Sequence, residues 1–117
     1  MTTILHISSR ADWLSAQTTG SYEADSLSSE GFIHCSRPDQ VLGVANTNNR
    51  FEGQTDLILL CIDPDQVAAE IRYENLDGGD NLFPHIYGPL NVDAIKDILE
   101  FVPDNNGVFT LPQKLLR

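Results

Sequence analysis

The sequence contains few basic residues. Only seven Lys and Arg stand against seventeen Asp and Glu in 117 residues, which gives a formal net charge of −10 with histidine neutral. Proteins that bind nucleic acid or anionic membranes use basic side chains to neutralise phosphates. The acidic balance therefore argues against nucleic acid and against a membrane surface as partners, although a local pocket still has room for one phosphate.

Cysteine and long apolar segments are also scarce. Cys35 and Cys61 show neither CxxC nor Cys-His spacing, so we expect two reduced, buried thiols. The longest apolar run, Leu57–Ile62, is far shorter than the roughly 20 residues of a membrane-spanning helix. Residues 1–4 lack the pattern of a secretory signal. We therefore expect a single cytoplasmic domain over residues 1–117 with no membrane segment.

Short apolar segments separated by turns predict a mixed structure. Strands are predicted at residues 4–7, 32–36, 56–62, 71–74 and 83–87. Helices are predicted from Ser8 or Ser9 to about Gln17, from Pro38 to about Ala45, and from Asn91 to about Glu100. Because strands do not alternate strictly with helices and several are joined by tight turns, we predict an α+β fold with mainly antiparallel sheet.

Further expectations concern the loops and one helix face. Trp13 and Leu14 are expected on the inner face of the first helix, and residues 21–30 are expected to form an ordered loop over the site. Residues 75–82 are predicted to be a turn or loop, and residues 105–107 a hairpin turn.

The three histidines are the main functional lead. His6, His34 and His85 each lie within a short apolar segment rather than among charged residues. Alternate side chains of a strand point to the same face, so neighbouring strands would bring one imidazole each into a single cleft. Histidine is also the side chain whose charge and proton transfer are most easily tuned near neutral pH.

The second histidine shares its strand face with one aromatic and one polar residue. Phe32, His34 and Ser36 share one face of their strand, and Ile33 and Cys35 share the other. A ligand ring stacked on Phe32, with polar anchors at His34 and Ser36, is one interpretation. The other is a structural histidine bonded to backbone, with Ser36 capping the next helix.

The third histidine lies in a strand that contains a proline. His85 and Tyr87 share a face, and Pro84 lacks a ladder donor, which indicates an edge strand or a bulge. Such positions direct side chains into sites. Alternatively, residues 88–89 form a simple turn and Tyr87 is a core aromatic. Taken alone, His6 is more typical of a structural histidine.

Other chemistries receive less support from the sequence. Three imidazoles plus water form a known catalytic zinc arrangement, but the spacing carries no metal signature, so we assign no metal. No GxSxG motif or phosphate-binding glycine pattern is present, and residues 77–80 form only a fragment of a calcium loop. Arg72 and Glu74 share a strand face and are expected to form a surface ion pair, or Arg72 meets a ligand phosphate.

Two strings resemble the DUF952 family, small proteins of bacteria and plants: Gly31-Phe32-Ile33-His34-Cys35-Ser36 and Phe83-Pro84-His85-Ile86-Tyr87-Gly88-Pro89-Leu90-Asn91. Residues 5–7, Trp13, 40–46 and 56–63 fit the same pattern in order. The resemblance implies a fold like that of ADP-ribosyltransferases, with two small, mainly antiparallel sheets flanking a cleft and two or three helices. In active relatives with that fold, the cleft binds NAD.

The resemblance also implies positions for the histidines. His6 would hold the adenosine-side ribose, His34 with Ser36 would support the nicotinamide pocket, and His85 would stand where a glutamate orients the nicotinamide ribose. Breaking the nicotinamide–ribose bond develops an oxocarbenium-like cation, for which a carboxylate is the natural partner. The glutamate expected at the third position is not evident in the sequence.

The leading hypothesis is a histidine-lined cleft that binds NAD or another nucleotide-like ligand and transfers ADP-ribose or a related glycosyl group. The candidate catalytic residues are His6, His34 and His85, and the candidate ligand-binding residues are Phe32, Ser36, Arg72 and Tyr87. NAD would be a substrate, and no other cofactor is implied. The alternatives are a non-catalytic ligand-binding or regulatory module and, with less support, a metal-dependent hydrolase that uses the three histidines. The sequence identifies no protein partner.

Overall fold

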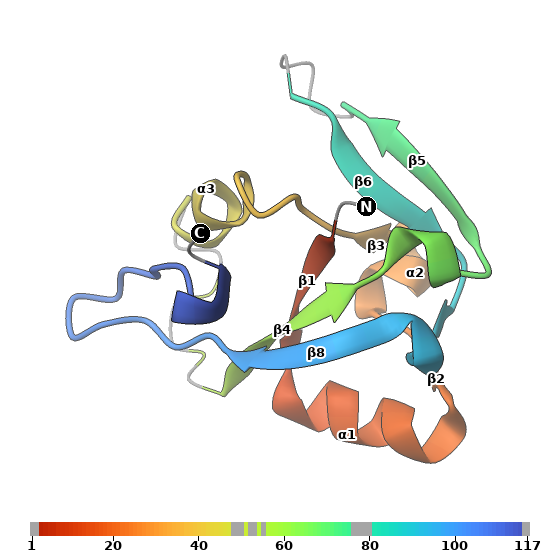
Figure 1. The fold of residues 1–117 in the computed structure, drawn as a ribbon, viewed down its shortest axis with the longest axis horizontal. Helices are drawn as coiled ribbons and strands as arrows, with labels where there is room; N and C mark the ends of the chain where they lie inside the picture. Colours follow the sequence, from red (N-terminus) through yellow and green to blue (C-terminus); the bar gives the residue numbers. More distant parts are fainter. Residues whose placement is uncertain (1–2, 48–50, 52–53, 55, 76–80, 116–117) are drawn as a thin grey trace.

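The computed structural model describes residues 3–47, 51, 54, 56–75 and 81–115 (Figure 1). With short 3-10 helices labelled η, the elements in chain order are β1 (Ile4–Ser9), α1 (Arg10–Thr19), β2 (Ser21–Tyr22), α2 (Asp25–Glu30), β3 (Ile33–His34), α3 (Val41–Ala45), β4 (Leu57–Ile62), η1 (Pro64–Gln66), β5 (Glu70–Glu74), β6 (Phe83–Tyr87), β7 (Leu90–Asn91), η2 (Val92–Ala94), β8 (Ile95–Glu100) and η3 (Gln113–Leu115). Short helices and small sheets thus form the α+β class that the sequence predicts.

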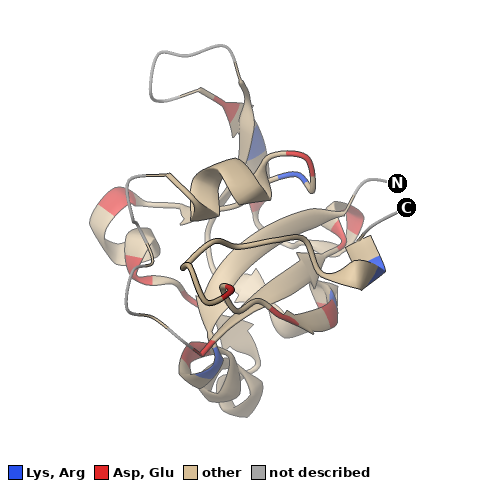
Figure 2. Ribbon diagram, turned by 90° about the vertical axis from the view of Figure 1, so that its left-hand side faces the viewer, with Lys and Arg blue, Asp and Glu red and all other residues tan. Residues whose placement is uncertain are grey.

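Every pairing between these strands is antiparallel. One sheet has the strand order β1-β4-β8, a second has the order β3-β6-β5, and β2 pairs with β7. Leu5 and Ser36 connect the two larger sheets, because each backbone N–H donates to the other's carbonyl, at 2.7 and 2.8 Å. Acidic segments occur on several sides of the molecule, whereas basic segments are few (Figure 2).

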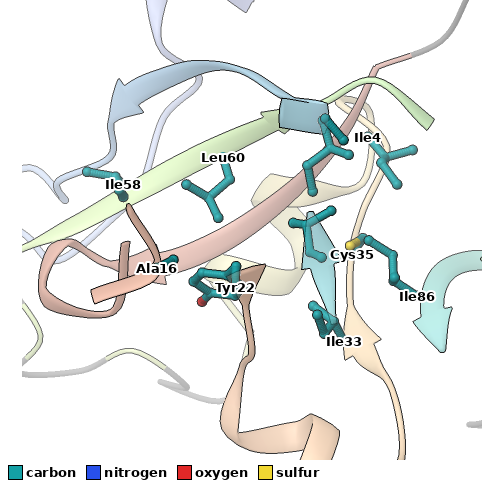
Figure 3. Close-up of a cluster of buried hydrophobic side chains, with 11 residues drawn as sticks. Ile4, Ala16, Tyr22, Ile33, Cys35, Ile58, Leu60 and Ile86 are labelled. Carbon is teal, nitrogen blue, oxygen red and sulfur yellow. The ribbon is translucent and has the colours of Figure 1, made fainter. Parts of the chain in front are cut away.

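β4 separates two hydrophobic clusters. Its residues are all buried, as its apolar sequence predicts. Ile58, Leu60 and Ile62 enter a first cluster, while Leu57, Leu59 and Cys61 enter a second. The first cluster fills the space between the two larger sheets, where it includes Ile33 of β3, Cys35 just after β3, and Ile86 of β6 (Figure 3). The opposite face of the β3-β6-β5 sheet is therefore left for other side chains.

The first helix begins at the predicted cap, but it ends at Thr19 rather than at about Gln17. Ser9 is the N-cap, and its hydroxyl accepts a hydrogen bond from the Asp12 N–H at 3.1 Å. Gly20 ends the helix at φ 84°, a left-handed conformation that glycine adopts without steric cost. The expectation that Leu14 faces inward is wrong, because its side chain is 55% exposed. The inner face instead carries Trp13 and Ala16, three residues apart.

The predicted helix over residues 91–100 is wrong. The chain instead forms the end of β7, the short η2 and then β8, which pairs with β4. A helical spacing of apolar residues does not by itself distinguish a helix from a strand in a short segment. Here β8 supplies backbone hydrogen-bond partners to the side of β4 that β1 leaves open.

The connecting segments agree with the predictions in part. Residues 21–30 hold β2 and α2 rather than the expected loop. Residues 105–107 form the predicted turn, in which the Gly107 N–H donates to the Asp104 carbonyl at 2.9 Å, but no strand flanks it in the described ranges. Most of the predicted loop at residues 75–82 lies outside the described residues. None of the helices in the described part of the chain combines the length and apolar content needed to cross a bilayer.

Candidate functional site

His34 and His85 lie directly opposite each other in the β3–β6 pair. The adjacent ladder bond runs from the Cys35 N–H to the Pro84 carbonyl at 3.0 Å. Because ladder bonds alternate along an antiparallel pair, His34 and His85 occupy a non-hydrogen-bonded position, where opposite side chains come closest. Their ring centroids are 5.5 Å apart with planes at 88°. Two of the three histidines therefore meet as predicted.

Aromatic rings surround these imidazoles. The Phe32 ring centroid lies 4.8 Å from that of His34, 4.6 Å from that of His85 and 5.3 Å from that of Tyr87. Phe32 and His85 are only 6% and 4% exposed, so the phenyl ring covers much of the His85 imidazole. The shared face predicted for Phe32 with His34, and for His85 with Tyr87, is thus present.

β5 adds two charged residues to this face. Arg72 lies opposite His85 in the β5–β6 pair, and Glu74 lies two residues further on, so both point to the same side of the sheet. We refer to the group as the histidine–aromatic cluster, which consists of Phe32, His34, Arg72, Glu74, His85 and Tyr87.

Glu74 is the functional candidate that sequence reasoning missed. Its Oε1 accepts a hydrogen bond from the Tyr87 hydroxyl at 2.6 Å and lies 3.1 Å from His85 Nδ1. The Tyr87 hydrogen bond, with further support from His85, lowers the pKa of Glu74, and the same contact raises the pKa of Tyr87. The two predicted strands at residues 71–74 and 83–87, next to each other in the sequence, were the signal that could have placed Glu74 beside His85.

The Glu74 contact determines how His85 presents its ring. A carboxylate only accepts hydrogen bonds, so His85 Nδ1 carries the proton at this contact. A neutral imidazole then offers Nε2 as an acceptor, and Nε2 has no hydrogen-bond partner among the described residues. Carboxylate, imidazole and a ring nitrogen able to take a proton thus form a short relay.

Arg72 does not form the predicted ion pair with Glu74. Its Nε and second guanidinium nitrogen donate to the two carboxylate oxygens of Glu70, at 3.0 and 3.1 Å. The guanidinium carbon also lies 4.6 Å from the centroid of the Tyr87 ring, a cation–π distance. Arg72 and Glu70 are both exposed, so the pair contributes little to stability.

A second glutamate contacts the other histidine of the cluster. His34 Nε2 lies 3.0 Å from Glu30 Oε2 at the end of α2. Both side chains are about half exposed. The sequence predicts a loop for this segment and does not indicate a role for Glu30. Each imidazole of the cluster therefore has its own carboxylate partner.

His6 lies on the other side of β3 and does not join the two imidazoles. Its Nδ1 is 2.6 Å from the backbone carbonyl of His34, and its Nε2 is 2.9 Å from the Tyr22 hydroxyl, which is 2.9 Å from Ser8 Oγ. Burial lowers the pKa of His6 to about 4, so the ring is neutral at neutral pH. A carbonyl only accepts, so Nδ1 donates to the His34 carbonyl, and Nε2 contacts the Tyr22 hydroxyl. This arrangement has the character of a structural histidine.

Of the two roles predicted for Ser36, the helix cap is wrong, and the ligand anchor stays a prediction. Its backbone bridges to Leu5, and it is buried at 6% exposure. No side-chain hydrogen bond of Ser36 occurs among the described residues. It does not cap α3, whose N-cap is Gln40.

The described residues offer no metal centre at this cluster. No group of three or more His, Cys, Asp or Glu side chains is arranged there to hold a metal ion. Two cavities lined by described residues lie elsewhere, one of about 320 Å³ along β4 and β8 and one of about 210 Å³ beside α1.

Similarity to known proteins identifies the family. Residues 7–98 match the family described as "Protein of unknown function (DUF952)". Two crystal structures, of the protein CC0527 from Caulobacter crescentus and of its double mutant, are similar to this chain. Each has 32% sequence identity to this chain and a TM-score of 0.86, and each match covers 99% of this chain and 100% of the other. A solution NMR structure of CC0527 is 34% identical, with a TM-score of 0.77 over 92% of this chain and 91% of that one. No curated protein matches the sequence. The chain belongs to the DUF952 family.

Proposed function

We propose that the histidine–aromatic cluster binds a nucleotide-like ligand such as NAD, and that the protein is an ADP-ribosyl or related glycosyl transferase. The observation that carries this proposal is the Glu74 carboxylate, held between His85 Nδ1 and the Tyr87 hydroxyl. Glu74 lies beside His85 and supplies the acidic group that is not evident at that position in the sequence. The two larger sheets, both small and antiparallel, are compatible with an ADP-ribosyltransferase-like fold.

The side chains around Glu74 match the parts of a nucleotide. The Phe32 and Tyr87 rings provide apolar faces for a base or a nicotinamide. The exposed Arg72 guanidinium can exchange Glu70 for a phosphate, which it contacts in the same two-pronged geometry. Oε2 of Glu74 has no partner among the described residues and can accept a hydrogen bond from a ribose hydroxyl. The ligand would thus lie across β5 and β6.

The proposed reaction uses two groups of the cluster. The bond between the ribose C1′ and the nicotinamide nitrogen breaks, and a bond forms between C1′ and the oxygen of an acceptor hydroxyl. Glu74 stabilises the oxocarbenium-like charge on the ribose. His85 Nε2 takes the proton of the acceptor hydroxyl, because Glu74 holds the ring with its proton on Nδ1.

The alternative is a binding or regulatory module without chemistry. Burial of the central residues favours it, since His85 is 4% and Phe32 is 6% exposed. A ring that covers the imidazole leaves little space for a reacting ribose. Ligand binding at the exposed rim, formed by His34, Arg72 and Tyr87, would remain.

The first test is an NAD titration monitored by the imidazole NMR signals. His34 and His85 should shift together and saturate, whereas His6, which faces the core, should move little and serves as an internal reference. Equal shifts of all three rings, or no shift of His34 and His85, would overturn the proposed site.

The reaction needs its own assay. Nicotinamide release from NAD should be lost in Glu74→Gln and retained in Glu23→Gln, a matched change at an exposed glutamate outside the cluster. Saturable binding without nicotinamide release in the wild-type protein would assign the non-catalytic alternative and reject the transferase.

A further inference from the structure

A second candidate site lies on the other large sheet, away from the histidine–aromatic cluster. A cavity of about 320 Å³ is lined by the end of β4, by β8 and by η3. Both lysines of the chain, Lys96 and Lys114, line it. A cavity of this volume lies at the lower end of the range for small-molecule sites.

A β-bulge places one of the lysines at this cavity. Cys61 pairs with Asp97, but the next residue, Ile62, pairs with Ile95, so Lys96 is the extra residue of β8. Bulges redirect a side chain out of the regular alternation and occur often beside functional sites. The Lys96 Nζ donates to the Asp93 carbonyl at 2.9 Å, which leaves two ammonium protons for other acceptors.

The charges that line the cavity are unequally paired. Lys114 Nζ and Asp97 Oδ2 form an ion pair at 2.6 Å and neutralise each other. Lys96 and Asp63 also line the cavity, but neither forms an ion pair with any described residue. Within the described ranges, Asp63 Oδ1 accepts only the Asp65 N–H, at 3.0 Å, as the N-cap of η1. The cavity thus presents one unpaired positive and one unpaired negative charge.

Apolar side chains complete the lining. Leu99 on β8 and Leu115 on η3 are half-buried and pack against the second hydrophobic cluster. A simple anion would meet the carboxylate of Asp63, and a simple cation would meet the ammonium of Lys96. A zwitterion with an apolar group satisfies both charges and the leucines, and its zero net charge avoids repulsion by the acidic protein.

We propose that this cavity binds a free amino acid with an apolar side chain. Lys96 pairs with the ligand carboxylate, Asp63 pairs with its ammonium group, and the side chain packs against Leu99 and Leu115. This site goes beyond the proposed function and does not depend on it.

The thiol in the cavity wall does not suggest covalent chemistry. Cys61 lines the cavity, but burial raises the pKa of its thiol to about 11. A thiol rather than a thiolate is present at neutral pH, and thiols are poor nucleophiles. The inferred binding is therefore reversible and non-covalent.

The test is a titration of the wild-type protein with L-leucine, monitored by backbone amide NMR. Saturable shifts should appear at residues 61–63, 96–99 and 113–115. Two probes each lack one charge: 4-methylpentanoate has no ammonium group, and 3-methylbutylamine has no carboxylate. Each should bind at least about tenfold more weakly than L-leucine, because one charge-assisted contact is lost.

Variants assign the two charges. Asp63→Asn and Lys96→Met should each weaken L-leucine binding by about tenfold or more. Asparagine keeps the acceptor that caps η1, so Asp63→Asn decides the question even if Lys96→Met does not fold. Asp65→Asn and Arg37→Met are charge-matched controls outside the cavity and should bind as the wild type does.

Three results would overturn the proposal. The first is the absence of saturable shifts with L-leucine at millimolar concentration. The second is equal affinity for L-leucine and either probe, which would show that one charge has no role. The third is a set of shifts centred outside the three named segments.

Discussion

His34 and His85 face each other across the β3–β6 pair with ring centroids 5.5 Å apart, and each imidazole contacts a different glutamate. Glu30 reaches His34 from α2, and Glu74 reaches His85 from β5. The arrangement depends on strand register, because a slip of one residue would turn His34 or His85 towards the core. The β3–β6 pairing is therefore the part of the fold on which the candidate site rests.

Replacement of Glu74 should change the titration of Tyr87. The hydrogen bond to Glu74 is the largest cause of the raised pKa of Tyr87. Glu74→Gln removes the negative charge, so the pKa of Tyr87 should fall towards its ordinary value. An alkaline NMR titration of ¹³C-labelled tyrosine measures this, with Glu23→Gln as the control. An unchanged Tyr87 titration in Glu74→Gln would show that the contact is absent in solution.

The buried His6 should make stability depend on pH. Burial lowers its pKa from 6.5 to about 4 in the folded protein, whereas the unfolded chain takes up the proton near pH 6.5. Between these values the unfolded state binds more protons, so the free energy of unfolding rises with pH. The stabilisation is fully present above about pH 6.5 and is lost as pH falls towards 4, by about 3 kcal/mol.

Urea unfolding across this pH range measures the effect. Carboxylates also titrate near its acidic end, so the comparison is with His6→Gln, which is neutral and retains a donor and an acceptor. The variant should be less stable at neutral pH and should lose the part of the pH dependence that belongs to His6. Parallel pH profiles for the two proteins would contradict the assignment.

β4 should be sensitive to truncation on both of its faces. Leu60 packs into the first hydrophobic cluster and Leu59 into the second, and both are fully buried. Leu59→Ala and Leu60→Ala should each lower the free energy of unfolding by about 2–5 kcal/mol, through lost burial and a new cavity. The matched control is Leu14→Ala at an exposed position, which should cost less than about 0.5 kcal/mol. A small effect at either Leu59 or Leu60 would place that face of β4 at the surface.

Gly88, next to the candidate site, should not tolerate a larger residue. Its φ is 154°, and a Cβ atom there would approach Ala69 Cβ to 2.9 Å. Gly88→Ala should therefore lower the free energy of unfolding by about 1–3 kcal/mol, through backbone strain and the close contact. Gly43→Ala is the control, since it lies in α3 with open space around it and should be neutral or stabilising by up to about 1 kcal/mol. Thermal or urea unfolding distinguishes the two, and a neutral Gly88→Ala would contradict the geometry.

Much of the fold was predictable where local pattern and tertiary context agree. The apolar run of residues 57–62 predicts a buried strand, and β4 is buried throughout. Ser9 and Gly20 mark the limits of α1 through local hydrogen bonds and backbone conformation. The prediction for residues 91–100 was wrong because their apolar spacing also fits a helix. Only pairing with the open side of β4 makes this segment a strand.

The sequence itself determined which side chains share a face of each strand. Alternation along a strand is a local property of extended backbone, so it places His85 with Tyr87, and Phe32 with His34, before any pairing is known. Which strands become neighbours depends on contacts distant in the chain. The tertiary structure therefore decided that Glu74 meets His85, that Glu30 meets His34, and that His6 turns to the core beneath the His34 carbonyl. It also brought Lys96 and Asp63 to one cavity, through a bulge that no local spacing reveals.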